Sequence, residues 1–122
     1  MGALRLLFKA AFYTAFAAIS YLAVIPDYNG LPPIVTLSDL LNHAAAFFVL
    51  YLLLRGAHPS LDRVKSMLLL VVYAIMIEVV QSFLPTRDAS FSDIGADMAG
   101  IVLAHLFLGY LFLPALRKFR SA

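Results

Sequence analysis

The sequence predicts an all-α polytopic membrane protein, a four-transmembrane-helix bundle with its N- and C-termini in the cytoplasm. Hydrophobic residues make up 63% of the 122-residue chain and the mean hydropathy is +0.93, whereas soluble domains are usually about 45–50% apolar. Four long apolar runs divide the chain, and the basic residues are sorted between the loops in one consistent pattern. The length fits one compact bundle, so residues 1–122 are expected to form a single domain.

The apolar runs cover residues 6–25, 40–54, 67–84 and 94–113. Helices of roughly 17–25 residues cross a bilayer, so the second run is short and either borrows residues 34–37 or lies in a thinner part of the bilayer. The first run resembles a signal peptide because Arg5 and Lys9 precede it, but its length and the missing cleavage pattern favour a retained helix. All prolines fall at or beyond the run ends, where helices are expected to stop: Pro26, Pro32, Pro33, Pro59, Pro85 and Pro114.

Basic and acidic residues are distributed on opposite sides of these runs. Eight of the nine basic residues lie at the start of run one, between runs two and three, or after run four, and only Arg87 lies on the other side. Of the acidic residues, only Asp62 shares the basic side. Because cytoplasmic loops carry an excess of lysine and arginine, the loops at 26–38 and 85–92 are expected to face outward.

Composition excludes several functional classes. The chain has no cysteine, which excludes disulfides, thiol catalysis and cysteine–zinc sites. The net charge of +2 does not indicate nucleic-acid binding, because the positive charges are sorted by membrane side. Neither a glycine-rich phosphate loop nor an H-E-x-x-H motif is present, so no known hydrolase or transferase signature assigns a reaction.

Two expected helix starts on the outer side are alike: SDLLNHAAA at residues 38–46 and SDIGADMAG at residues 92–100. The match indicates either duplicated hairpins of parallel orientation or similar capping needs at similar depth. Small residues four apart, such as Ala96 and Gly100, allow close helix approach within the chain or in a homo-oligomer, and packing within the chain is favoured.

Polar residues concentrate between residues 78 and 100 and at the start of run two. Asp39 and His43 share a helix face because they are four apart, as do Asp93 and Asp97, while Glu78 and Gln81 are three apart. Carboxylates inside membrane helices are costly and persist where they have a partner, water or a task. These three polar faces lie at similar depth in the outer half of the bilayer, which predicts one shared pocket. The candidate catalytic residues are Asp39, His43, Glu78 and Asp93, and the candidate substrate-binding residues are Gln81, Arg87 and Asp97.

Each candidate also has a structural explanation. Capping alone explains acids at helix starts such as Asp39 and Asp93. His43 also fits a simple interhelical hydrogen bond, Gln81 fits a brace between helices, and Arg87 fits a partner for Asp88 or a lipid headgroup. Glu78 is the hardest to explain by structure, so a function or an essential internal ion pair is favoured for it.

Over residues 38–108 the chain resembles the VanZ-like family of small membrane proteins, named for a protein linked to teicoplanin resistance. The matching features are Asp39 and His43 before a long apolar run, then Glu78-x-x-Gln81, Pro85-x-Arg87, Ser92-Asp93 and Gly100. Leu40 stands where the family commonly has lysine, and Asp97 stands where it often has asparagine. The resemblance implies a multi-pass protein of the bacterial inner (cytoplasmic) membrane and a link to the cell envelope, but no reaction.

The expected ligand is a membrane lipid or lipid-linked cell-wall intermediate, and nucleic acid is excluded. The helix N-termini and Arg87 favour an anionic group, whereas the crowded carboxylates repel one. A divalent cation held by Asp39, His43, Glu78 and Asp93 reconciles these tendencies as a hypothesis, although no metal ligand set is assigned. The favoured function is binding, remodelling or cleavage of an anionic envelope lipid. The alternatives are a small transporter of ions or lipid, which needs polar residues in the inner half too, and a non-catalytic accessory subunit.

Overall fold

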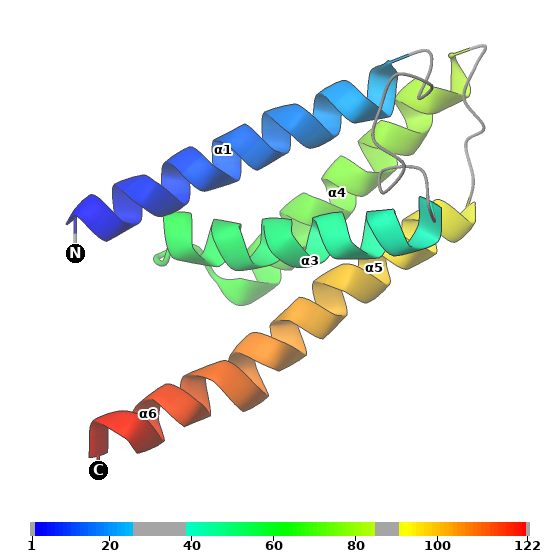
Figure 1. Cartoon of the computed structure of the whole chain (residues 1–122). Helices are drawn as coiled ribbons and strands as arrows, with labels where there is room; N and C mark the ends of the chain where they lie inside the picture. Colours follow the sequence, from blue (N-terminus) through cyan, green and yellow to red (C-terminus); the bar gives the residue numbers. More distant parts are fainter. Residues whose placement is uncertain (1, 26–38, 85–90, 122) are drawn as a thin grey trace.

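The computed structural model describes residues 2–25, 39–84 and 91–121, and this part of the chain is helical (Figure 1). The helices are α1 (Gly2–Val24), α3 (Asp39–Ala57), α4 (Arg63–Ser82), and a continuous helix made of α5 (Phe91–Leu106), the π-helical turn η1 (Phe107–Phe112) and α6 (Leu113–Ser121). In these ranges four helices are long and apolar enough to cross a membrane, the last reaching from Phe91 to Lys118. The predicted all-α, four-span architecture is therefore confirmed.

The helices alternate in direction through the bundle. Figure 1 shows both termini on the side where α3 ends and α4 begins, while α1 and α4 end and α3 and α5 begin at the opposite side. We call these the terminal end and the loop end of the bundle. The alternation agrees with the predicted topology, and the cytoplasmic location of the termini remains a prediction. Residues 26–38 and 85–90 lie outside the described residues, and with them four of the six prolines: Pro26, Pro32, Pro33 and Pro85.

Helix α3 is the centre of the bundle. It packs most extensively against α5 and next against α1. Its side chains Phe47, Leu50 and Tyr51 are almost completely buried, and Ile101 and Ala104 of α5 cover them. Large apolar side chains elsewhere on the four spans are exposed, as expected where a helix faces lipid. Because lipid is as apolar as leucine, tight side-chain packing and interhelical hydrogen bonds hold such helices together.

Two glycines let helices approach closely. A methyl group at Gly100 of α5 would overlap the backbone carbonyl of Ala44 in α3. A methyl group at Gly56 of α3 would overlap the ring of Phe8 in α1, which is a side chain and not backbone. Gly100 therefore packs within the chain, as the small-residue spacing predicted, and it sets the distance between α3 and α5.

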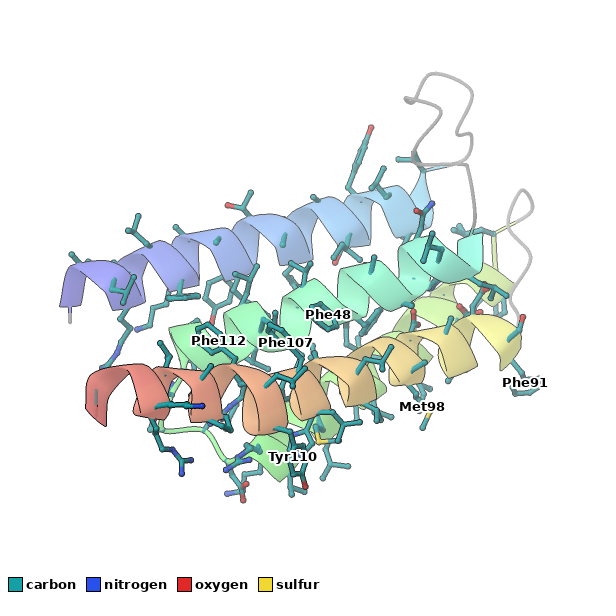
Figure 2. All side chains as sticks on the ribbon, turned by 60° about the horizontal axis from the view of Figure 1, so that its bottom comes forward. Phe48, Phe91, Met98, Phe107, Tyr110 and Phe112 are labelled. Carbon is teal, nitrogen blue, oxygen red and sulfur yellow. The ribbon has the colours of Figure 1, made fainter. Side chains whose placement is uncertain are left out.

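Pro114 does not end the last helix, contrary to the expectation that every proline marks a helix end. The chain continues from α5 through η1 into α6 without a break. Proline has no N–H and its ring clashes with the carbonyl four residues earlier, here Tyr110. The wider π-helical turn before Pro114, in which Leu113 N–H bonds to Leu108 O, accommodates the ring. The ring of Phe107 in η1 packs against Phe48 of α3 and stacks on Phe112, whereas Tyr110 is largely exposed (Figure 2).

The start of α4 is fixed by an N-cap. The side chain of Asp62 accepts a hydrogen bond from the backbone N–H of Val64, with a distance of 3.0 Å. An N-cap of this kind satisfies a backbone donor that has no partner inside the helix.

Replacing Asp62 by alanine is expected to lower the free energy of unfolding by about 1 kcal/mol, because the N–H of Val64 loses its acceptor. Chemical unfolding in detergent, followed by circular dichroism, measures the change. Asp62→Asn is the control, since asparagine is also a good N-cap and should retain most of the stability. An equal loss in both variants would contradict the capping role.

Candidate functional site

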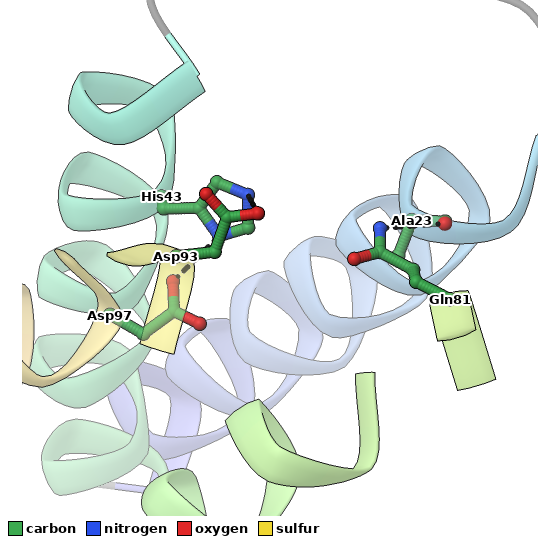
Figure 3. Close-up of polar contacts among 5 residues, drawn as sticks. All are labelled: Ala23, His43, Gln81, Asp93 and Asp97. Carbon is green, nitrogen blue, oxygen red and sulfur yellow. Dashed lines mark hydrogen bonds and ion pairs between the residues drawn. The ribbon is translucent and has the colours of Figure 1, made fainter. Parts of the chain in front are cut away.

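The candidate site is built around His43 of α3. Its Nδ1 lies 2.8 Å from Oδ1 of Asp97 on α5, so the two helices share a hydrogen bond near the loop end of the bundle (Figure 3). Helix α3 begins at Asp39, which places His43 just after its first turn. A carboxylate bonded to one ring nitrogen of a histidine orients the ring and fixes which nitrogen carries the proton. Nε2 is then the ring nitrogen left to act on other groups.

Two further carboxylates face the same histidine. Oδ2 of Asp93 lies 3.8 Å from Nε2 of His43, and both side chains are partly accessible, with 22% of His43 and 16% of Asp93 exposed. Glu78 on α4 is only 6% exposed, and its carboxylate lies within range of electrostatic interaction with the His43 ring. His43, Glu78, Asp93 and Asp97 thus form one group from three helices, which we call the acidic cluster.

Asp97 is the most deeply buried member of the acidic cluster. Its relative exposure is 0%, and its Oδ1 is hydrogen-bonded to Nδ1 of His43. Its second oxygen, Oδ2, is buried and has no hydrogen-bond partner within residues 2–25, 39–84 and 91–121. A buried acceptor without a donor is costly. Oδ2 therefore marks a position where a donor from a ligand or a bound proton would be stabilising.

Gln81 lies apart from the acidic cluster, although the sequence placed it in the same pocket. Its Nε2 donates a 3.0 Å hydrogen bond to the carbonyl oxygen of Ala23 near the end of α1 (Figure 3). This bond ties α4 to α1 at the loop end of the bundle. The bracing role considered for Gln81 is therefore observed, and a role in ligand binding remains a prediction.

Two other predicted site residues are placed only in part or not at all. Asp39 is the first residue of α3, but its side chain lies outside the described residues, as does the whole of Arg87. Their predicted roles in catalysis and substrate binding stay predictions.

In the described part of the chain, no three histidine, aspartate or glutamate side chains are arranged to hold a metal ion. Although three carboxylates surround His43, they do not converge on one point in the manner that a divalent ion requires. The hypothesis of a bound divalent cation thus has no complete ligand set among these residues.

A second polar pair links the same two helices and was missed in the sequence. The buried hydroxyl of Tyr51 lies 2.9 Å from Nδ1 of His105. Tyr51 follows His43 by eight residues, and His105 follows Asp97 by eight, so both pairs join positions 54 residues apart. The sequence motifs at 38–46 and 92–100 are also 54 residues apart. Helices α3 and α5 therefore run parallel with equivalent positions facing each other, which favours the duplication, and extending the repeat to Tyr51 and His105 would have found the pair.

The comparison with known proteins identifies a family. The sequence profile of the VanZ/LLP1 family matches residues 3–113, a stretch that contains the whole acidic cluster and most of each span. No match was found among curated proteins or among solved structures. The profile extends beyond the predicted resemblance at both ends and includes α1. The chain, with four helices in its described part that are long and apolar enough to cross a membrane, is a multi-pass membrane protein that belongs to the VanZ/LLP1 family.

Proposed function

We propose that the acidic cluster binds, and with His43 modifies, the headgroup of an anionic cell-envelope lipid or lipid-linked cell-wall intermediate at the outer face of the membrane. The observation that carries the proposal is the arrangement of His43 between buried Asp97 and accessible Asp93. When Asp97 accepts the Nδ1 proton, Nε2 is free to take a proton from a ligand hydroxyl, as in general base catalysis. The partly exposed Asp93 side would be the side from which the ligand approaches.

The headgroup chemistry follows from the charges of the cluster. Three carboxylates and one imidazole favour a ligand rich in hydrogen-bond donors, such as the hydroxyl groups of a sugar or glycerol. The phosphate of the same ligand would lie toward the loops, where Arg87 provides a planar donor fork in the sequence. The association with teicoplanin resistance, suggested by the resemblance to VanZ, fits a change in an envelope lipid or cell-wall intermediate.

The transport alternative has weaker support. The His43–Asp97 and Tyr51–His105 pairs are separated by two helical turns, or about 12 Å along the axis. Phe47, Leu50 and Ile101 are buried between these levels, with at most 1% exposure. An apolar layer of this kind interrupts a polar path along α3 and α5, so we favour a binding or catalytic role at one end of the bundle.

Lipid analysis of cells that produce the protein tests the proposal. We expect the wild-type chain to change the profile of envelope lipids or cell-wall intermediates, or to co-purify with one of them. His43→Gln is expected to reduce this effect by about 100-fold, because glutamine cannot exchange a proton at neutral pH.

His58→Gln is the matched control for this experiment. His58 bonds to the hydroxyl of Tyr13 with a distance of 3.0 Å and lies in the α3–α4 connection, far from the acidic cluster. It should leave the lipid profile unchanged when protein amounts are matched. If His43→Gln lowers stability while the lipid profile stays that of the wild type, the cluster is an internal brace and the accessory-subunit alternative is correct.

A further inference from the structure

A group of positive charges lies at the terminal end of the bundle, opposite the acidic cluster. Arg55 is two residues before the end of α3, and Arg63 is the first residue of α4. Both guanidinium groups lie within range of electrostatic interaction with the hydroxyl group of Tyr51, one turn before Arg55. We call Tyr51, Arg55 and Arg63 the basic cluster.

The guanidinium group of Arg55 is only partly satisfied by hydrogen bonds within the bundle. Its Nη1 donates to the backbone carbonyl of Leu61 and lies 3.5 Å from the hydroxyl of buried Ser66. Its Nε is buried and has no hydrogen-bond partner among the residues that the structure describes. A buried guanidinium donor without an acceptor is costly, and more so than a neutral one.

Arg63 completes the cluster from the other side. Its Nη1 lies 3.5 Å from the position that a Cβ of Gly109 would occupy, so the guanidinium rests against the η1 turn of the last span. Within the described ranges neither Arg55 nor Arg63 forms an ion pair with a carboxylate. The nearest acid in the sequence, Asp62, uses its carboxylate to cap α4. Among the described side chains, no carboxylate thus serves as the counter-ion that would offset the repulsion between these two cations.

The position of these cations identifies the kind of anion that fits. Both arginines stand at the ends of spans, which is the depth at which lipid phosphates meet the hydrocarbon region. Arginine presents a planar set of donors that matches phosphate oxygens. We propose that the basic cluster binds the phosphate of an anionic lipid in the leaflet at the terminal end, separately from the ligand of the acidic cluster.

The test uses the full chain in nanodiscs of phosphatidylcholine mixed with phosphatidylglycerol, with native mass spectrometry counting the phosphatidylglycerol molecules retained on the protein. The wild type is expected to retain phosphatidylglycerol preferentially. Arg63→Gln should lower the apparent affinity by about tenfold, since one charge-assisted contact is lost. Lys65→Gln is the matched control, because it removes an equal charge two residues away, on a different face of α4, and should change the affinity by less than about twofold.

Arg55→Gln adds a second variant with a different expectation. It should weaken lipid retention at least as much as Arg63→Gln. Because it also removes the hydrogen bond from Arg55 to the carbonyl oxygen of Leu61, the variant could fail to fold, and the Arg63→Gln result then tests the proposal by itself. Equal losses for Arg63→Gln and Lys65→Gln would indicate general attraction to a charged surface and overturn the proposal. If inorganic phosphate displaces the retained phosphatidylglycerol at the same sites, a free anion is the ligand and the lipid assignment is wrong.

Discussion

Replacing Gly100 by alanine is expected to destabilise the protein by about 3 kcal/mol or to prevent folding, because the added methyl group has no space. The obstructing atoms belong to the backbone of Ala44 and not to a flexible side chain. Relief therefore requires α3 and α5 to move apart along the most extensive helix contact in the bundle. The separation would also disturb the His43–Asp97 bond, because His43 directly precedes Ala44 and Asp97 lies about one turn before Gly100.

Gly95→Ala on the same helix is the control for this prediction. A methyl group at Gly95 would meet no atom within 4 Å, so the substitution should be neutral or slightly stabilising through its helix propensity. Gly56→Ala should fall between the two, since the obstructing atoms belong to the side chain of Phe8 and not to a backbone. Unfolding in a mixture of detergent and denaturant, followed by circular dichroism, measures all three. Equal stability of the Gly100 and Gly95 variants would contradict the close approach of α3 and α5.

The sequence predicted the parts of the fold that depend on composition and pattern. Each of the four apolar runs corresponds to one membrane-span helix, but some helix ends differ from the predicted ends by a few residues. Helix α4 already begins at Arg63, and α3 continues past Arg55 and Gly56. These residues are polar or small, so hydropathy alone excluded them, although long side chains reach water from a helix end. The continuation of the last helix through Pro114 was not predictable, because it depends on the π-helical turn that accommodates the ring.

The sequence singled out the members of the acidic cluster but did not predict how they pair. Spacing along a helix places Asp39 and His43 on one face, yet it gives no information about which residue of another helix faces them. The hydrogen-bond and ion-pair partners of His43 come from α5, and the closer one is Asp97, which stands where the family often has asparagine. Gln81 faces α1 because of the rotation of α4, which the sequence does not determine. Interhelical geometry thus decides which polar residues join the cluster.

Substitutions of Asp97 distinguish its contribution to stability from its contribution to the proposed function. Asp97→Ala is expected to lower the free energy of unfolding by about 2 kcal/mol. Interhelical hydrogen bonds in membrane proteins contribute about 0.6 kcal/mol on average and at most about 1.7 kcal/mol. The His43–Asp97 bond involves a fully buried carboxylate, so the cost of losing it should lie at the upper end of this range. Asp93→Ala should cost less than about 1 kcal/mol, because Asp93 is 3.8 Å from His43 and partly exposed.

Asp97→Asn distinguishes the two roles because asparagine has nearly the same shape and retains an oxygen that accepts the Nδ1 proton of His43. It should therefore keep most of the stability that Asp97→Ala loses. It removes the negative charge that would stabilise a protonated His43, so the lipid-dependent effect is expected to fall by about 100-fold. Unfolding in detergent and the lipid profile, measured on the same preparations, provide the two readouts. A variant with both stability and lipid effect intact would show that the charge of Asp97 has no part in the function, because the hydrogen bond to His43 would then suffice.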